Sequence, residues 1–236
     1  MKKMIKKLGF IVILAVIGLT MGACNSEPAC SHDWTGWNLI SFGRETRNCN
    51  SCTAVQARLT RNIGETGEAV GRIFYCNAAG FTLQDINPVN NKTVYYLEAW
   101  TANETASEWG DYGILVVNIT TFTSNSASAA RIIGNGRKDT QIIAAHMTGK
   151  SITGTAAQRC ASATHGGRND WFLPSLGELS ELKKAKGQPN VPTSGSFWSS
   201  SQFGSSAAWG EWFDSDYPIN SAKDSDSNDV RAVRAF

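Results

Sequence analysis

Three features are scarce in this 236-residue sequence. Charged side chains make up only 18% of it, histidines number three, and no cysteine follows Cys160. The apolar share of 42% is ordinary for a chain that folds. His32, His146 and His165 stand in unrelated contexts, so the sequence offers no Cys–His or Ser–His–Asp arrangement for nucleophilic catalysis. We therefore expect a folded protein that is not an enzyme.

Long apolar segments are also lacking, with one exception at residues 8–19 (LGFIVILAVIGL). This run is shorter than a bilayer span, follows four lysines and leads into Gly22, Ala23 and Cys24. The order is typical of a bacterial lipoprotein signal, although Met21 stands where the usual motif has leucine. We expect residues 1–23 to be a signal peptide, with cleavage before Cys24 and lipidation of that thiol. An ordinary secretory signal with an incidental Cys24 is the alternative.

Basic residues are in excess only in the precursor. Removal of the four signal lysines leaves 18 of the 22 basic residues and all 20 acidic ones, so the net charge is −2. No nucleic-acid partner is therefore expected. Acyl chains on Cys24 would insert into a lipid bilayer, and each buried methylene would contribute about 0.8 kcal/mol to binding. We therefore expect the membrane to be a partner. Because Asn25 replaces the aspartate that retains many lipoproteins at an inner membrane, we expect the outer membrane or the cell surface.

Lipidation of Cys24 leaves five cysteines, an odd number for an exported protein. A disulfide between Cys76 and Cys160 would close about 85 residues and contribute at most about 4.5 kcal/mol. Two buried free thiols are the alternative.

The remaining cysteines lie near the mature N-terminus, within residues 24–61. Three thiols and one imidazole there could hold zinc, and one disulfide plus a loose thiol is the competing interpretation; the four residues are Cys30, His32, Cys49 and Cys52. With Trp34, Trp37, "ETRNCNSC" and Arg58, the segment resembles a short module of bacterial surface proteins, although Thr53 replaces the usual glycine. We expect a spacer.

Residues 62–236 alternate strand and helix signals. Residues 72–76 (RIFYC) predict a strand followed by an NAAG turn, residues 92–100 predict another strand, and "WGDYGILVVNI" predicts a loop leading into a strand. Helices are expected from Asp139, around Cys160, and after Ser175, where Glu178 completes a capping box. After Gly187 only short strands are expected. The fold class is α+β with a largely antiparallel sheet.

The late motifs carry a family resemblance. "GRNDWFLPSLGELSELKKAKG", "FWSSSQFGSSAAWGEWFDSD" and "VRAVRAF" resemble the Lcl C-terminal-like (Fibrobacter succinogenes major) family of bacterial exported domains, as do "GRIFYCNAAGF", "VYYLEAW" and "IIGNGRKDTQIIAAH". The resemblance implies a C-type-lectin-like fold over residues 62–236, related to formylglycine-generating enzymes and to the variable proteins of diversity-generating retroelements. It also implies that Trp171 and Trp198 are buried.

In such folds the late loops form the ligand surface. Short polar residues with interspersed aromatics resemble a paratope and predict binding of an extracellular protein or glycan, although they also suit any soluble loop. The candidate residues are Ser205, Ser206, Trp209, Glu211, Trp212, Asp214, Asp216, Tyr217, Asn220, Asp224, Asp226 and Asn228. A more specific form of this hypothesis is that a retroelement diversifies the tail. A template repeat and a reverse transcriptase beside the gene would support it, and their absence would reject it.

Two alternatives stay open. "DSDSND" presents Asp224, Asp226, Asn228 and Asp229 with the spacing of calcium loops, which suggests a calcium-dependent lectin, but the glycine and glutamate of an EF-hand are missing. A formylglycine-generating-like enzyme is disfavoured because that fold uses late cysteines.

Overall fold

The computed structural model describes residues 33–124 and 132–236. Its chain divides into two compact units, Met1–Asn62 and Ile63–Phe236. The predicted signal peptide, Cys24, Cys30 and His32 lie outside the described residues. Within residues 33–124 and 132–236, no helix has the length and apolar character that a membrane crossing requires.

The smaller unit is a three-stranded antiparallel sheet of β1 (Asn38–Ser41), β2 (Arg44–Asn48) and β3 (Val55–Leu59), in that order. Its tryptophans stack with arginines. The Arg47 guanidinium lies 5.0 Å from the ring centre of Trp34 and 4.7 Å from that of Trp37, and Arg58 lies 4.1 Å from Trp37. In its described part only two apolar side chains are buried, those of Cys49 and Ala54. Cation–π contacts therefore provide much of the side-chain packing in the described part of the smaller unit.

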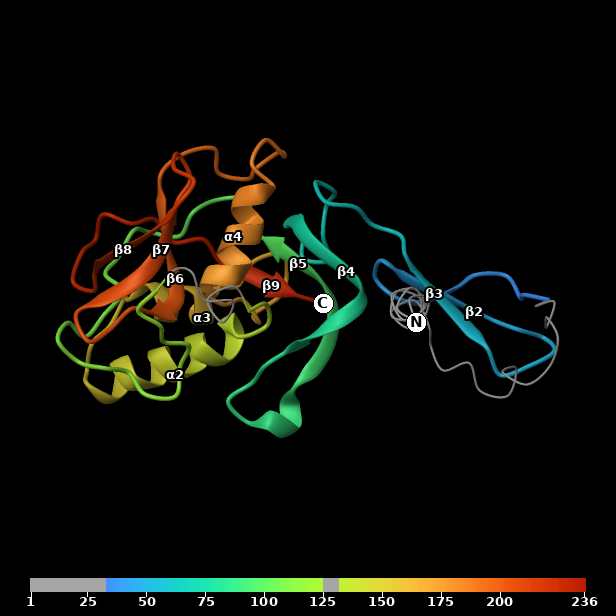
Figure 1. Cartoon of the computed structure of the whole chain (residues 1–236), viewed down its shortest axis with the longest axis horizontal. Coiled ribbons are helices and arrows are strands. Elements are labelled where there is room, and N and C mark those ends of the chain that lie inside the picture. The colour runs from blue at the N-terminus through green and yellow to red at the C-terminus, as the bar shows by residue number, and fades with distance from the viewer. Residues whose placement is uncertain (1–32, 125–131) are drawn as a thin grey trace, which may run out of the picture. The chain divides into compact units, whose positions relative to one another are not determined.

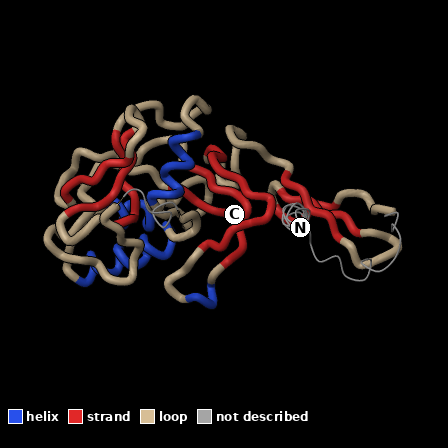
Figure 2. The backbone as a smooth tube through the Cα atoms, viewed as in Figure 1, coloured by secondary structure: helices blue, strands red, loops and turns tan. Residues whose placement is uncertain are grey.

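The larger unit combines two three-stranded antiparallel sheets with helices (Figures 1 and 2). One sheet has the order β4 (Arg72–Leu83), β5 (Lys92–Ala99), β9 (Val233–Ala235). The other runs β6 (Ser196–Gln202), β7 (Ala207–Trp212), β8 (Pro218–Ala222). The helices are α2 (Gly136–Gly149), α3 (Ala156–Ser162), α4 (Leu176–Lys184) and the 3-10 turn η1 (Pro88–Asn90). The α+β class and its antiparallel pairing are confirmed.

Several elements differ from expectation in detail. The NAAG segment is no turn, because β4 continues through it with a shift of register between Cys76 and Phe81. Residues 109–119 form turns and bends instead of leading into a strand. Helix α2 begins at Gly136, and Asp139 lies buried within its first turn. The Asp139 carboxylate accepts a hydrogen bond from the backbone N–H of Thr120 at 3.2 Å, so it ties the preceding loop to the helix.

The predicted Cys76–Cys160 disulfide is wrong, because both residues are free thiols. Cys76 lies on β4 opposite Tyr96, whereas Cys160 lies on α3 in the cluster that contains Trp171. Burial raises the pKa of both thiols, that of Cys160 well above its ordinary value. Separation along the chain indicated how much a bridge would stabilise the fold but not which elements would face each other.

Buried indole rings hold the larger unit together. Trp109, Trp171 and Trp198 belong to one apolar cluster with Ile143 and Met147 of α2. The burial predicted for Trp171 and Trp198 is confirmed, with 3% and 0% of their surfaces exposed. Their polar N–H groups are satisfied by backbone carbonyls: Trp109 Nε1 donates to Ser199 at 2.8 Å and Trp198 Nε1 to Ser107 at 3.0 Å. Each ring can thus fill a loop-rich interior without leaving a donor unpaired.

Candidate functional site

The sheet β6–β7–β8 carries most of the predicted ligand residues at two opposite ends, whereas Trp209 and Asn220 pair with each other in its middle. Its register pairs Ala207 with Ala222 and Glu211 with Pro218. The turn after β6 and the turn after β8 therefore share one end, with Ser205, Ser206, Asp224 and Asp226. The β7–β8 connection lies at the other end, with Asp214, Asp216 and Tyr217. Strand β7 separates the two groups by roughly 17–20 Å at about 3.4 Å per residue. One small ligand cannot contact both ends.

Three of the predicted residues are buried, so they cannot form part of a free binding surface. Trp209 packs on Leu176, and its Nε1 donates to the carbonyl of Phe122 at 2.8 Å. Glu211 is 2% exposed; Ser180 Oγ donates to its Oε1, and Lys183 Nζ to its Oε2 at 2.9 Å. Asn228 is also 2% exposed. The sequence pattern failed here because soluble loops and buried strands in this region have the same mixture of Trp, Ser and Asp.

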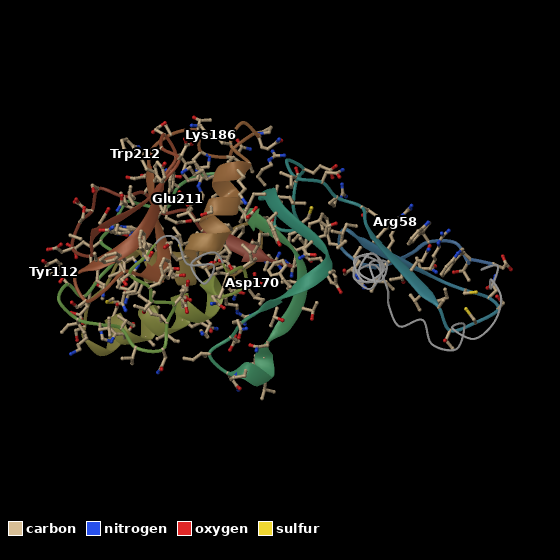
Figure 3. The ribbon with its side chains drawn as sticks, in the orientation of Figure 1. Arg58, Tyr112, Asp170, Lys186, Glu211 and Trp212 are labelled. Carbon is tan, nitrogen blue, oxygen red and sulfur yellow. The ribbon has the colours of Figure 1, made fainter. Side chains whose placement is uncertain are left out.

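At the β7–β8 connection, two large aromatic side chains are exposed beside carboxylates. Trp212 is 47% exposed and Tyr217 is 72% exposed, and Asp214 and Asp216 between them are exposed too. Because Glu211 pairs with Pro218, Trp212 and Tyr217 occupy the next position beyond the last paired residues of the hairpin. We call these four residues the Trp212 surface. Figure 3 shows Trp212 and Lys186 at the same end of the unit.

The exposure of Trp212 follows from its place at the end of β7, on the face opposite to that of Glu211 and Phe213. Side chains on a strand point alternately to opposite faces. Glu211 and Phe213 point inward, the first to α4 and the second onto Phe197, whose ring centroid is 4.8 Å away. Trp212 lies between them and points outward.

Backbone contacts fix the connection. Lys186 Nζ donates to the Phe213 carbonyl at 3.0 Å, and the Gly195 N–H donates to Asp214 Oδ2, also at 3.0 Å. The Phe213 N–H donates to the Gly195 carbonyl at 2.8 Å. The aromatic side chains are therefore presented from a backbone held in place, which lowers the entropy lost on binding.

At the opposite end of the sheet lies a segment that the sequence did not predict to be part of a binding site. We call residues 112–117 the Tyr112 loop; its large apolar residues Tyr112, Ile114, Leu115 and Val117 are exposed. The signal for it was available, since residues 112–130 contain no charged side chain. Figure 3 shows Tyr112 well apart from Trp212.

The described residues contain no cluster of carboxylate, thiol and imidazole side chains that is arranged to hold a metal ion. Within residues 33–124 and 132–236, no group of three or more His, Cys, Asp and Glu side chains could hold an ion, so Asp224 and Asp226 do not gather with Asp229 into one. Of the predicted zinc ligands, Cys30 and His32 lie outside the described residues, and the zinc site stays a prediction.

A small cavity of about 200 Å³ lies beside α2. Its polar walls already have partners: Arg137 lies 2.7 Å from Asp85, and Asp170 pairs with Arg234. The lining residues are Arg137, Thr140, Gln141, Ala161, Asn169, Asp170, Trp171 and Phe172. These contacts indicate a structural role, and the cavity is not our candidate.

No family model matches the chain, and no curated protein matches it. One solved structure with a detectable likeness is a fimbrial protein from Bacteroides ovatus, 11% identical over 61% of this chain, with a TM-score of 0.44. The match covers 36% of the fimbrial protein, so this chain spans about a third of its length.

Proposed function

We propose that this protein is a lipid-anchored surface lipoprotein whose larger unit has a C-type-lectin-like fold and binds an extracellular protein or glycan at the Trp212 surface. The lipid anchor is supported by the lysine-rich apolar leader before Cys24. The lectin-like fold is supported by the late sequence motifs and by the α+β arrangement of antiparallel sheets.

The observation that carries the proposal is the exposure of Trp212 and Tyr217 on a fixed hairpin. Exposed tryptophan and tyrosine side chains are enriched among the residues that dominate binding energy. A flat indole also stacks on the apolar face of a sugar, and the neighbouring carboxylates of Asp214 and Asp216 can accept hydrogen bonds from hydroxyl or amide donors. Both ligand classes therefore suit this surface.

The test is a screen of the mature chain, residues 24–236, on glycan and host-protein arrays, followed by titration of the ligand found. The double variant Trp212→Ala/Tyr217→Ala should bind at least about thirtyfold more weakly, the loss expected when dominant contacts are removed. Tyr112→Ala is the control, because it removes an exposed tyrosine from the other end of the sheet.

Failure to bind any array member, or a ligand that the double variant holds as tightly as the natural chain, would reject the proposal. Thermal melting of each variant accompanies the titration, because a surface substitution should leave the folded state intact.

A further inference from the structure

The Tyr112 loop exposes four large apolar side chains within six residues. Tyr112 is 55% exposed, Ile114 42%, Leu115 51% and Val117 64%. Contiguous exposed apolar groups mark interaction sites more often than isolated ones do. The Trp212 surface lies at the far end of the same sheet, so this loop is not part of the site proposed above.

Side chains at the end of the sheet hold the loop backbone by hydrogen bonds. Gln202, at the end of β6, exchanges two hydrogen bonds with Val116: its Oε1 accepts from the Val116 N–H at 3.0 Å, and its Nε2 donates to the Val116 carbonyl at 3.1 Å. Lys223, which is fully buried, donates from Nζ to the Ile114 carbonyl at 2.7 Å and to Gln202 Oε1 at 2.6 Å.

Further contacts hold the start of the loop. The Gly110 N–H donates to the Lys223 carbonyl at 3.0 Å, and Asp111 Oδ2 lies 2.7 Å from His146 Nε2 of α2. The exposed side chains are thus presented by a rigid backbone, as a binding surface requires, and are not the chance result of a loose segment.

The two chain segments that form the loop and the turn beside it carry mostly acidic charge, and α2 contributes His146 next to Asp111. Residues 101–124 contain three acidic residues and no lysine or arginine. In residues 202–230 the only basic side chain is the buried Lys223, whereas Asp224 and Asp226, directly after it, are exposed. The surface therefore has an apolar centre with an acidic and hydroxyl-bearing rim, to which Ser205 and Ser206 belong. An apolar centre with a polar rim is the general anatomy of protein interfaces.

We propose that the Tyr112 loop is a second docking surface, and that its occupant is a protein partner with an apolar centre flanked by lysine or arginine. The charge of the rim selects this partner, because opposite charges favour encounter and like charges across an interface are costly.

The probe is a short amphipathic helical peptide of leucine and lysine, compared with a leucine–glutamate peptide and a serine–lysine peptide of the same pattern, each titrated against the mature chain. We expect only the leucine–lysine peptide to bind, with affinity that falls as salt rises. Ile114→Ser/Leu115→Ser/Val117→Ser should weaken binding at least about tenfold. Asp224→Asn/Asp226→Asn should weaken it and flatten the salt dependence.

Two control variants separate this surface from the first one. Asp214→Asn/Asp216→Asn removes the same charge from the other end of the sheet, and Trp212→Ala/Tyr217→Ala removes the aromatic pair there. Neither variant should change the affinity for the peptide. The second docking surface can therefore be rejected while the proposed function stands, and the proposed function can be rejected while the second docking surface stands.

Three results would overturn the inference: no binding of the leucine–lysine peptide, equal binding of the leucine–glutamate peptide, or equal binding by the triple variant. Two alternative occupants are tested in parallel. Self-association in analytical ultracentrifugation that the triple variant abolishes would assign the loop to a second copy. Binding to phosphatidylcholine–phosphatidylglycerol vesicles that the triple variant abolishes would assign it to a membrane. Either result would also replace the basic protein partner.

Discussion

Tryptophan has two opposite roles on neighbouring strands of this chain. Trp198 on β6 is fully buried and donates to a backbone carbonyl, whereas Trp212 at the end of β7 is nearly half exposed. They lie on paired strands of the same short sheet, where Trp198 is opposite Gly210 and Trp212 is opposite Ser196. Both rings therefore point to the same face of the sheet, and the core covers Trp198 within β6 but not Trp212 at the end of β7.

Substitution should separate these roles. Trp198→Ala removes a large buried side chain and should lower the free energy of unfolding by about 3–5 kcal/mol, because the surrounding core cannot fill the cavity. Trp212→Ala should change it by no more than about 0.5 kcal/mol. Urea unfolding of the two variants and the natural chain gives the comparison. Similar losses for both would mean that Trp212 is packed in the core.

The sequence predicts a short strand at β6, but its serines hide the full burial of that strand. Ser199, Ser200 and Ser201 are all fully buried. Ser199 Oγ donates to the Trp209 carbonyl at 2.7 Å, and Ser201 Oγ accepts from the N–H of Leu176 at 3.1 Å. Small hydroxyl side chains there let strands and helix approach while their polar groups stay satisfied.

At the scale of the element, α4 is the helix that the sequence predicts best. Its capping box is confirmed: Glu178 accepts from the Ser175 N–H at 2.8 Å, and Ser175 Oγ accepts from the Glu178 N–H at 3.3 Å. The sequence does not predict how deeply Glu178 is buried. The carboxylate is fully buried and also accepts from the Gly134 N–H at 2.7 Å, so the cap extends to the segment before α2.

Burial of this carboxylate makes stability depend on pH. Desolvation raises the pKa of Glu178 to about 7, although backbone N–H groups of Ser175, Gly134 and Gly136 oppose the rise. The ordinary value of 4.5 applies to the unfolded chain. Between about pH 4.5 and 7 the folded state binds more protons than the unfolded state, so the free energy of unfolding should fall as pH rises through this window. Burial also raises the pKa of Asp139, to about 6, which acts in the same direction.

The measurement is urea unfolding of the natural chain and of Glu178→Gln at pH 5 and pH 8. The glutamine cannot titrate, so the stability of the variant should fall less between the two pH values. At 1.36 kcal/mol per pKa unit, Glu178 alone accounts for a pH-dependent change in the free energy of unfolding of roughly 3 kcal/mol at most. Parallel pH profiles for the two proteins would show that Glu178 is ionised throughout.

How far the sequence predicts an element depends on whether its signal is local. Helix α4 has a cap, an apolar face and basic residues in its last turn, all within about three turns, and was predicted correctly. Strand β8, in contrast, reads PINSA and carries no strand signal of its own; it forms by pairing with β7. The bulge in β4 likewise depends on its pairing with β5. The two ends of the candidate site could not be separated before the register of β6, β7 and β8 was known.

At the scale of the whole molecule, the larger unit is stabilised without a covalent bridge. Residues 63–236 contain only two cysteines, Cys76 and Cys160, and both are free. All three apolar clusters of the described residues lie in this unit.

The C-terminal strand is held by ion pairs. Arg234 of β9 lies 3.0 Å from the fully buried Glu98 of β5 and 2.7 Å from Glu68. The Glu98 carboxylate also accepts from the backbone N–H groups of Ala69 and Gly71, both at 2.9 Å. The end of the chain is thereby joined to the start of the unit.

The unfolding temperature of the larger unit should therefore be the same with and without a reducing agent. Calorimetry of the mature chain, with alkylation and mass spectrometry to count free thiols, checks this. Cys160 should become alkylated only when the unit unfolds, because it is buried and burial raises its pKa. A transition that falls on reduction would restore the disulfide that the structure does not contain.

The alternation of Glu211, Trp212 and Phe213 has a consequence for how this protein can change over generations. Replacing the outward residue, or the short stretch after Phe213, leaves the inward ion pair and the phenylalanine contact untouched, so many different recognition surfaces are compatible with one scaffold. Adding or deleting a single amino acid in β7 would instead swap inside for outside and expel a carboxylate from its lysine partner. Natural variants should thus differ freely in composition here while keeping the same spacing.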